Sequence, residues 1–204
     1  SINTNPAAGY KTGVAFNSVP DFGATILAPF GKESKIGFQL DLGHSSLAYQ
    51  LLPEDRDMQS DSTNFTESYR YFTVAPGFNF AGFTIGISFG MPIGASMESE
   101  RGQSTHPIHG FFASDEKIPD YVDSLASITE VFIGGRIPLV DSPSGKLTFD
   151  IQASYTLSGL YDNYKSYQYA YEENSKGQLE AKEDRNPKPV ALKMGLSYLF
   201  GIGF

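Results

Sequence analysis

The chain ends in the stretch PVALKMGLSYLFGIGF, residues 189–204. Every second residue from Val190 to Phe204 is apolar, and the residues between them are mostly small, with a single cation at Lys193. Because successive side chains of a β-strand point to opposite faces, this strand has one tall apolar face and one face of small residues. A tilted strand that crosses a hydrocarbon layer of about 30 Å needs such a face.

Other segments show the same two-residue period, with apolar residues opposed by Gly, Ser, Thr and isolated charges. Together with the final strand they predict an all-β fold, an eight-stranded antiparallel up-and-down transmembrane β-barrel. The segments are 10–18, 22–30, 36–43, 71–78, 83–94, 130–139 and 147–158.

The connections between these segments alternate in length. Those at 31–34, 79–82 and 141–145 are tight turns rich in residues that tolerate turn geometry. Long polar loops are expected at about 51–66, 97–126 and 162–187. Short periplasmic turns and long extracellular loops are typical of bacterial outer-membrane barrels.

The whole chain, 1–204, is expected to form one domain, because no linker or composition break divides it. Residues 1–9 are expected to be an N-terminal periplasmic segment, with both termini on the side of the short turns. Alternatively, residues 1–20 occupy the lumen or pack elsewhere. The segment around 161–187 is either a protruding hairpin that turns near 174–177 or a disordered polar loop.

Charges on the small-residue face help to decide which face is inside. A soluble lipocalin-like barrel has its apolar face inside and would carry many charges outside, whereas here the opposite face has few. A narrow eight-stranded barrel is filled by small and paired side chains, which favours the membrane interpretation. The predicted lumen charge network is Lys11, Asp41, Glu130, Arg136, Asp150 and Lys193.

Tyrosines lie mainly toward the ends of the predicted strands. An amphipathic ring at a strand end suits the level of the lipid headgroups, so we expect these side chains to face outward there. They are Tyr10, Tyr49, Tyr69, Tyr71, Tyr155, Tyr161 and Tyr198.

Composition narrows the location and the partners. The formal net charge is -8, which disfavours nucleic acid as a partner because phosphate binding needs Lys and Arg clusters. The chain has no cysteine and no run of eighteen apolar residues that would predict a membrane-spanning helix. It begins without a basic and apolar leader, so the sequence is either cytoplasmic or a form from which a signal peptide has been removed. The strand pattern favours a chain from which a signal peptide has been removed, and it therefore predicts that the protein is located in the outer membrane.

Two segments, 191–204 with its terminal Phe and 29–43, resemble small outer-membrane β-barrel proteins of Gram-negative bacteria. The chain is similar to the broad class of OmpA-, OmpX- and OmpW-like barrels, and more closely to barrel-domain proteins of the Bacteroidota type. The resemblance implies that Tyr198, Phe200 and Phe204 act as a C-terminal assembly signal read by the barrel-assembly machinery. It also implies outer-membrane lipid and lipopolysaccharide as surroundings.

One polar pair has the spacing of a hydrolase site. His44 and Ser46 share the outward parity of the third predicted strand, and a His-x-Ser spacing is similar to that of outer-membrane lipid A deacylases. Glu54 or Asp55 would have to orient the histidine. The alternative is an ordinary His and Ser pair at the polar boundary of the membrane.

A second polar group lies in the long loop at 97–126. His106 and His109, near Asp115 and Glu116, have ligand chemistry but lack a firm third ligand and a rigid spacing. An ordinary loop is the stronger reading, so we expect neither a metal nor any other cofactor.

These observations predict a non-enzymatic outer-membrane barrel that acts through its external loops as a structural or interaction component of the cell envelope. It is a candidate subunit of a larger complex, with a protein partner at the loops. One alternative is a narrow channel for small solutes that passes Glu130, Arg136 and Asp150. The other is a surface lipid hydrolase that uses His44 and Ser46.

Overall fold

A computed structural model describes the chain over its strands and turns. The described residues are 1–4, 6, 10–16, 20–31, 35–53, 64–99, 104–106, 110–112, 125–142, 145–162, 171–173, 179–181 and 186–199. Every regular element among them is a β-strand, in agreement with the predicted all-β class. No helix in this part of the chain has the length and the apolar character needed to cross a membrane.

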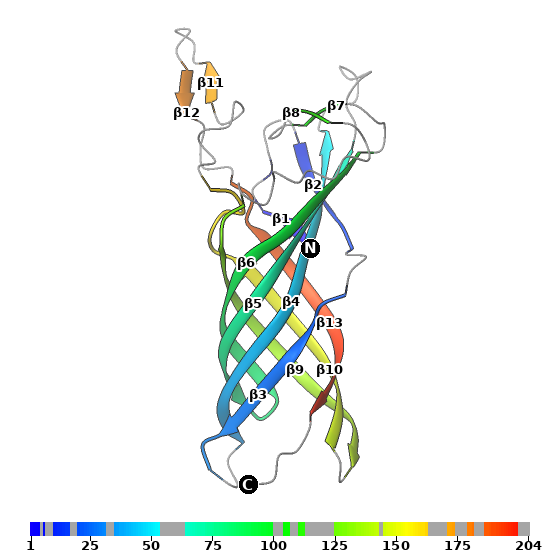
Figure 1. The fold of residues 1–204 in the computed structure, drawn as a ribbon, viewed down its shortest axis with the longest axis vertical. Coiled ribbons are helices and arrows are strands. Elements are labelled where there is room, and N and C mark those ends of the chain that lie inside the picture. The colour runs from blue at the N-terminus through cyan, green and yellow to red at the C-terminus, as the bar shows by residue number, and fades with distance from the viewer. Residues whose placement is uncertain are drawn as a thin grey trace.

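One nine-stranded antiparallel sheet contains most of the chain (Figure 1). Its order is β1-β13-β10-β9-β6-β5-β4-β2, and β3 also pairs with β4. The strands are β1 (Ile2–Asn3), β2 (Tyr10–Val14), β3 (Phe22–Pro29), β4 (Ile36–Pro53), β5 (Phe65–Phe80), β6 (Phe83–Ser99), β9 (Ile128–Ser142), β10 (Gly145–Thr156) and β13 (Pro189–Leu199).

Two small hairpins belong to the long connections. β7 (Ser104–His106) pairs with β8 (Gly110–Phe112), and β11 (Tyr171–Glu173) pairs with β12 (Leu179–Ala181). The second hairpin encloses residues 174–178, where the sequence predicts a protruding hairpin to turn. The first was not predicted, because its strands carry no clear alternation.

The long strands extend further than predicted. β4 has 18 residues and β6 has 17, which at about 3.3 Å per residue gives lengths of roughly 55–60 Å. The tight connection predicted at 79–82 is confirmed, because β5 ends at Phe80 and β6 begins at Phe83, and Ala81 and Gly82 between them have φ angles of 52° and 95°. The breaks between β3 and β4 and between β9 and β10 also fall at the predicted positions. The expected long loop at 51–66 is shorter than predicted, because β4 continues to Pro53 and β5 begins at Phe65.

The expectation that 10–18 and 22–30 form two successive, neighbouring strands of an up-and-down barrel is wrong. β2 and β3 both run antiparallel to β4, and β2 pairs with its upper part (Tyr49–Pro53) while β3 pairs with its lower part. They are therefore two halves of one interrupted strand. β4 is long enough to pair with both, and at the interruption Asp21 Oδ1 accepts a hydrogen bond of 2.7 Å from the Ser46 backbone N–H.

The first residues of the chain lie between β13 and β2. Ile2 pairs with Val190, and Ser1 and Ala15 exchange backbone N–H···O hydrogen bonds of 2.8 and 3.2 Å. This level is in the half of the sheet nearer the long connections, so the expectation that the N-terminus lies on the short-turn side is wrong. The described residues form no ladder between β3 and β13.

The sheet is curled, so that residues far apart in its order meet on the inner face (Figure 1). Lys193 on β13 forms an ion pair with Asp21 beside β3, and Thr84 on β6 donates to Gln39 on β4 at 3.0 Å. We call this concave side the inner face and the opposite side the outer face. The half near the tight turns is the lower half, and the half near the long connections is the upper half.

The two halves have opposite polarity. On β5, the inner residues are Phe65, Glu67, Tyr69 and Tyr71 in the upper half, and Thr73, Ala75, Gly77 and Asn79 in the lower half. The outer residues change from Thr66, Ser68 and Arg70 above to Phe72, Val74, Phe78 and Phe80 below. The apolar side chains therefore face inward above Tyr71 and outward below it.

A β-bulge accommodates this change on β6. The pairing of β5 with β6 shifts between Arg70 and Tyr71, where Arg70 pairs with Gly94 but Tyr71 pairs with Pro92. A bulge inserts one residue and reverses the parity beyond it. As a result Ile93 is exposed outside, whereas Met97 above it packs against the inner core.

Glycine at position 86 is required by the packing of the inner face, and this can be tested. A Cβ atom there would lie 2.7 Å from Phe132 Cζ and too close to the Pro76 carbonyl oxygen. We expect Gly86→Ala to lower the free energy of unfolding by about 1–3 kcal/mol, measured as a lower urea midpoint in detergent micelles. Gly195→Ala is the matched control, because nothing lies within 4 Å of a Cβ atom there. Equal midpoints for the two variants would contradict the packing.

Candidate functional site

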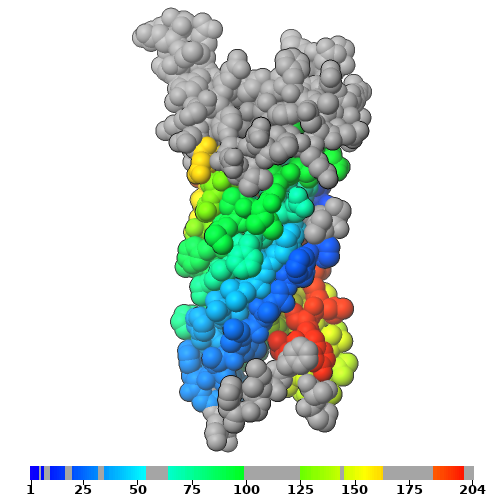
Figure 2. All heavy atoms as spheres, in the orientation of Figure 1, coloured from blue at the N-terminus to red at the C-terminus, as the bar shows by residue number. Residues whose placement is uncertain are grey.

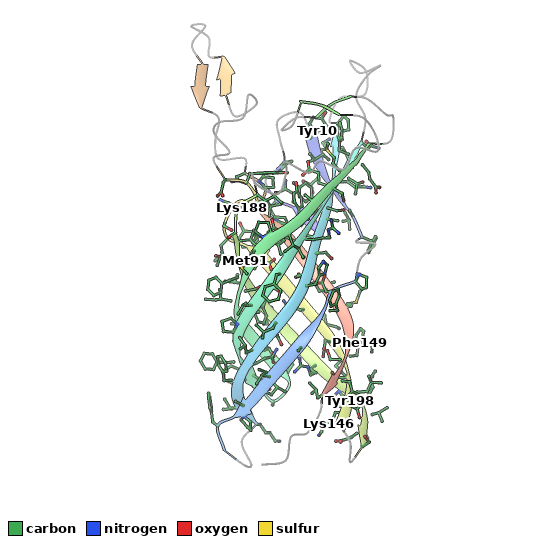
Figure 3. All side chains as sticks on the ribbon, viewed as in Figure 1. Tyr10, Met91, Lys146, Phe149, Lys188 and Tyr198 are labelled. Carbon is green, nitrogen blue, oxygen red and sulfur yellow. The ribbon has the colours of Figure 1, made fainter. Side chains whose placement is uncertain are left out.

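Exposed apolar side chains cover the outer face of the lower half. Ile85 on β6 is 54% exposed and Leu196 on β13 is 68% exposed, values that are unusual for contiguous large hydrophobic residues. Figure 3 shows such side chains around the wall, among them the labelled Met91 and Tyr198. Its members include Phe22, Ile26, Phe72, Phe78, Phe80, Phe83, Ile85, Ile87, Phe89, Met91, Ile93, Ile133, Ile137, Leu139, Leu157, Leu192, Met194 and Leu196.

The inner face of the lower half carries paired charges. Arg136 on β9 donates from Nε to Asp150 Oδ1 on β10 at 3.0 Å. Thr148 donates to the same carboxylate at 3.1 Å, and Ser197 donates to its other oxygen. These contacts bring two of the predicted charges, Arg136 and Asp150, into one network that joins β9, β10 and β13.

Lys193 is the centre of a second group of charges. Its Nζ atom donates to Ser45 Oγ and lies 3.6 Å from Asp21 Oδ2 and 3.9 Å from Glu130 Oε2. Glu130 is only 1% exposed and also accepts hydrogen bonds from Ser154 and Thr156 at 3.2 and 3.4 Å. We call Lys193, Glu130, Asp21 and Ser45 the Lys193 cluster.

The remaining predicted charges lie apart from these groups. Asp41 accepts hydrogen bonds from Thr25 and Gln39 at 2.5 and 2.6 Å on the inner face. Lys11 is exposed and pairs with Leu52, on the opposite face from buried Leu51. It therefore does not join the inner charges, because the first strand is interrupted and its upper part has a different register from the one expected.

The inner face of the upper half is filled by an aromatic cluster. Tyr49 and Tyr69 both donate from their hydroxyls to the buried Glu67 carboxylate, and the two hydroxyl oxygens lie 3.2 Å apart. Tyr161 contacts the Tyr69 hydroxyl and packs edge-on against its ring. The buried apolar core consists of Leu47, Tyr49, Leu51, Phe65, Tyr69, Tyr71, Leu125, Ile128, Leu160, Tyr161 and Ala191.

This cluster corrects the expectation for four tyrosines. Tyr49, Tyr69, Tyr71 and Tyr161 are buried inside, at 2% exposure or less, and not at an outer belt. Burial, together with the nearby Glu67, raises the pKa of the Tyr161 phenol well above its usual value. From Phe65 to Tyr71 one parity is aromatic apart from Glu67 and the other is polar, and this alternation was the signal that could have shown the burial.

The predicted hydrolase pair has a different geometry from a catalytic dyad. The His44 ring stacks on Phe22 at a centroid distance of 5.0 Å, and its buried Nδ1 atom has no hydrogen-bond partner among the described residues. The Ser46 hydroxyl donates to Asp21 Oδ1 at 2.9 Å. Asp21, which the sequence did not single out, is thus the carboxylate beside this serine.

Several predicted site residues lie outside the described part of the chain. These are Glu54, Asp55, His109, Asp115, Glu116, Phe200 and Phe204, together with most of the three long loops. His106 lies in β7, where only the backbone is described. Among the described residues, no group of three or more His, Cys, Asp or Glu side chains could hold a metal ion.

Comparison of the chain with models of protein families, with curated proteins and with solved structures found no match. The functional argument therefore depends on the geometry alone.

The Lys193 cluster yields a prediction for stability. Lys193→Met leaves the buried Glu130 carboxylate without its cation, and loss of one partner from a buried ion pair costs about 3–5 kcal/mol. We expect a lower urea midpoint for this variant in detergent micelles. The double variant Lys193→Met with Glu130→Gln is expected to recover most of the loss, because the fully buried carboxylate is then neutral and the remaining one, Asp21, is 32% exposed to solvent. A double variant no more stable than the single one would contradict the pairing.

Proposed function

We propose that this protein is a small transmembrane β-barrel of a bacterial outer membrane, and that it acts without catalysis as a structural or interaction component of the cell envelope. The observation that carries the proposal is the outer band of exposed apolar side chains over a polar inner face in the lower half. Such a band is unfavourable in water. It is favourable in lipid, because insertion into the membrane removes a large apolar area from water.

The height of the band supports this location. On β6 the exposed apolar residues run from Phe83 to Ile93, and a tilted transmembrane strand needs about 9–11 residues. Above Ile93 the outer face becomes polar at Ser96 and Glu98. The upper halves of the strands would then stand outside the membrane as a projecting stalk with its own apolar core.

The aromatic cluster supports an interaction role over the channel alternative. It lies on the inner face of the stalk and closes the upper end with fully buried side chains, among them Tyr49 and Tyr71. A conducting pore needs a continuous polar path that ions can follow. For the hydrolase alternative, the contacts do not pair His44 with the serine: the His44 ring stacks on Phe22, and the Ser46 hydroxyl donates to Asp21 instead. The long loops that the stalk carries are then the expected sites of contact with a partner.

The membrane location can be tested with tryptophan reporters, because the chain has no Trp. Ile87 and Ser96 lie on the same strand and both face outward, one inside the apolar band and one above it. In reconstituted vesicles we expect Ile87→Trp fluorescence to be quenched by lipids with brominated acyl chains. Ser96→Trp fluorescence is expected to be quenched by iodide in the buffer. If iodide quenches Ile87→Trp while brominated lipid does not, the proposal fails.

The closed interior gives an expectation for conductance. In planar bilayers the protein should show no steady unitary current, because the aromatic cluster blocks the upper end. The positive control is any porin inserted under the same conditions. A reproducible unitary current that changes in Arg136→Ala would favour the channel alternative.

A further inference from the structure

Arg70 lies on the outer face, directly above the apolar band. On β5 the next outward residue below it is Phe72, and the next one above it is Ser68. The Arg70 side chain is exposed, whereas its inward neighbours Tyr69 and Tyr71 are buried. Figure 2 shows the outer face of β4, β5 and β6, in cyan to green, on one side of the molecule.

The registers of β4, β5 and β6 place this arginine in the first polar row of the wall. Residues that pair directly across the three strands lie at one level, and successive outward rows are about 6.6 Å apart along a strand. From the tight turns upward, the rows are Leu42 with Val74 and Phe89, His44 with Phe72 and Met91, Ser46 with Arg70 and Gly94, Ala48 with Ser68 and Ser96, and Gln50 with Thr66 and Glu98. The change from mainly apolar to polar rows therefore falls between Phe72 and Arg70.

Gly94 gives the head of Arg70 a place on the wall. A Cβ atom at Gly94 would lie 2.6 Å from Arg70 Nη2, 3.0 Å from Nε and 3.1 Å from Cζ. The guanidinium therefore crosses from β5 to β6 and occupies the space that a side chain at Gly94 would fill. A guanidinium has five N–H donors in a planar fork, which can bind two oxygens of one phosphate group at once.

The charge of Arg70 is available to a ligand. Glu98, the outward carboxylate on β6, is two rows higher, about 13 Å away along the strand. Asp21 contacts Ser46, the partner of Arg70 on β4, but its carboxylate is paired with Lys193 at 3.6 Å. Within the described part of the chain, Arg70 forms no ion pair.

The surroundings of Arg70 match one kind of ligand. If the apolar band lies in hydrocarbon, the first polar row above it lies at the level of the lipid headgroups, where the phosphate groups are. Ser68 and Ser96 are direct partners one row higher and add two hydroxyl donors. Phe72 and Met91, one row lower, are 41% and 55% exposed and offer an apolar surface to acyl chains. The ligand is thus an amphiphile with a phosphate group directly above its apolar chains.

We propose that Arg70, with Ser68 and Ser96, binds the phosphate group of an anionic membrane lipid whose acyl chains lie along Phe72 and Met91. The headgroup has a net negative charge, because a zwitterionic headgroup brings its own cation to the phosphate. The chain has a formal net charge of -8, so a general attraction of anionic lipid is not expected and the binding is local to Arg70. The inference rests on the proposed membrane location and names the class of lipid bound at one place on the wall.

Two tryptophan reporters on the full chain test the site, because the chain has no Trp. Phe72→Trp reports on the lipid beside Arg70, and Ile85→Trp reports on the lower end of the band. Each variant is reconstituted in vesicles of phosphatidylcholine and phosphatidylglycerol, with bromine on the acyl chains of one lipid or of the other. The two quenching curves give the preference for phosphatidylglycerol at each reporter. We expect a preference of about fivefold at Phe72→Trp, as for one cation at an anionic surface, and none at Ile85→Trp.

Three further variants, each made with Phe72→Trp, separate contact from general charge. Arg70→Gln should reduce the preference to about one. Arg70→Lys keeps the charge but loses the fork, so its preference should lie between these values. Gly94→Ala keeps Arg70 but displaces its head from β6, so its preference should also be lower than that of Phe72→Trp alone.

Free phosphate is the other source of the same chemistry. Sodium phosphate is therefore compared with sodium chloride at the same ionic strength, in vesicles that contain Phe72→Trp. Because the lipid phosphate is held at the wall by its acyl chains, we expect the two salts to have equal effects on the preference for phosphatidylglycerol. A preference that phosphate abolishes and chloride does not would identify free phosphate as the ligand and overturn the inference.

Other outcomes would also overturn it. They are an unchanged preference in Arg70→Gln or in Gly94→Ala, and an equal preference at Ile85→Trp. Failure of the membrane location gives a different result, since iodide and not brominated lipid then quenches Ile87→Trp. If brominated lipid quenches Ile87→Trp but Phe72→Trp shows no preference, only the lipid site fails.

Discussion

The alternation of side chains along a single strand constrains the whole molecule. Each long strand must place apolar residues outward in its lower half and inward in its upper half, although the backbone geometry does not change. β5 achieves this at Tyr71 and Phe72, where two neighbouring aromatic residues point to opposite faces. β6 achieves it with the bulge at Ile93, which reverses the parity above it. In the lower half the strands therefore form a wall with its apolar side chains on the outer face. In the upper half the same strands pack their apolar side chains into a core on the inner face.

The Lys193 cluster lies at the level where these two arrangements meet. It joins β13 to β4, to β9 and to the interruption between β2 and β3, so it connects elements from opposite ends of the sheet order. A buried carboxylate such as Glu130 is costly unless it is paired and hydrogen-bonded. The pairing thus favours one specific curl of the sheet, because a sheet that opened would leave these charges uncompensated.

The sequence allowed the lower half to be predicted well and the upper half poorly. The apolar parity of β6, β9, β10 and β13 and the positions of the tight turns follow from the two-residue period and from turn residues, which are local signals. The prediction that β2 and β3 are successive neighbouring strands was wrong, because the local sequence does not show which strands pair. Each segment has the pattern of a separate strand, and only the length of β4 shows that both pair with it. The tyrosines were misplaced because an outer belt was assumed for aromatic residues at strand ends. Of the predicted inner charges, Arg136 with Asp150 and Lys193 with Glu130 are in contact, whereas Lys11 is outside.

The pairing of Ile2 with Val190 also has a consequence for the order of assembly. The ladders from β3 to β10 join strands that follow one another along the chain, so they form from contacts of low sequence separation. The ladder between β1 and β13 joins residues at opposite ends of the sequence and carries the largest loop-closure entropy. Ser1, Ile2 and Asn3 can dock only after β13 has been made and added. Residues 1–3 are therefore among the last described residues to find their native neighbours.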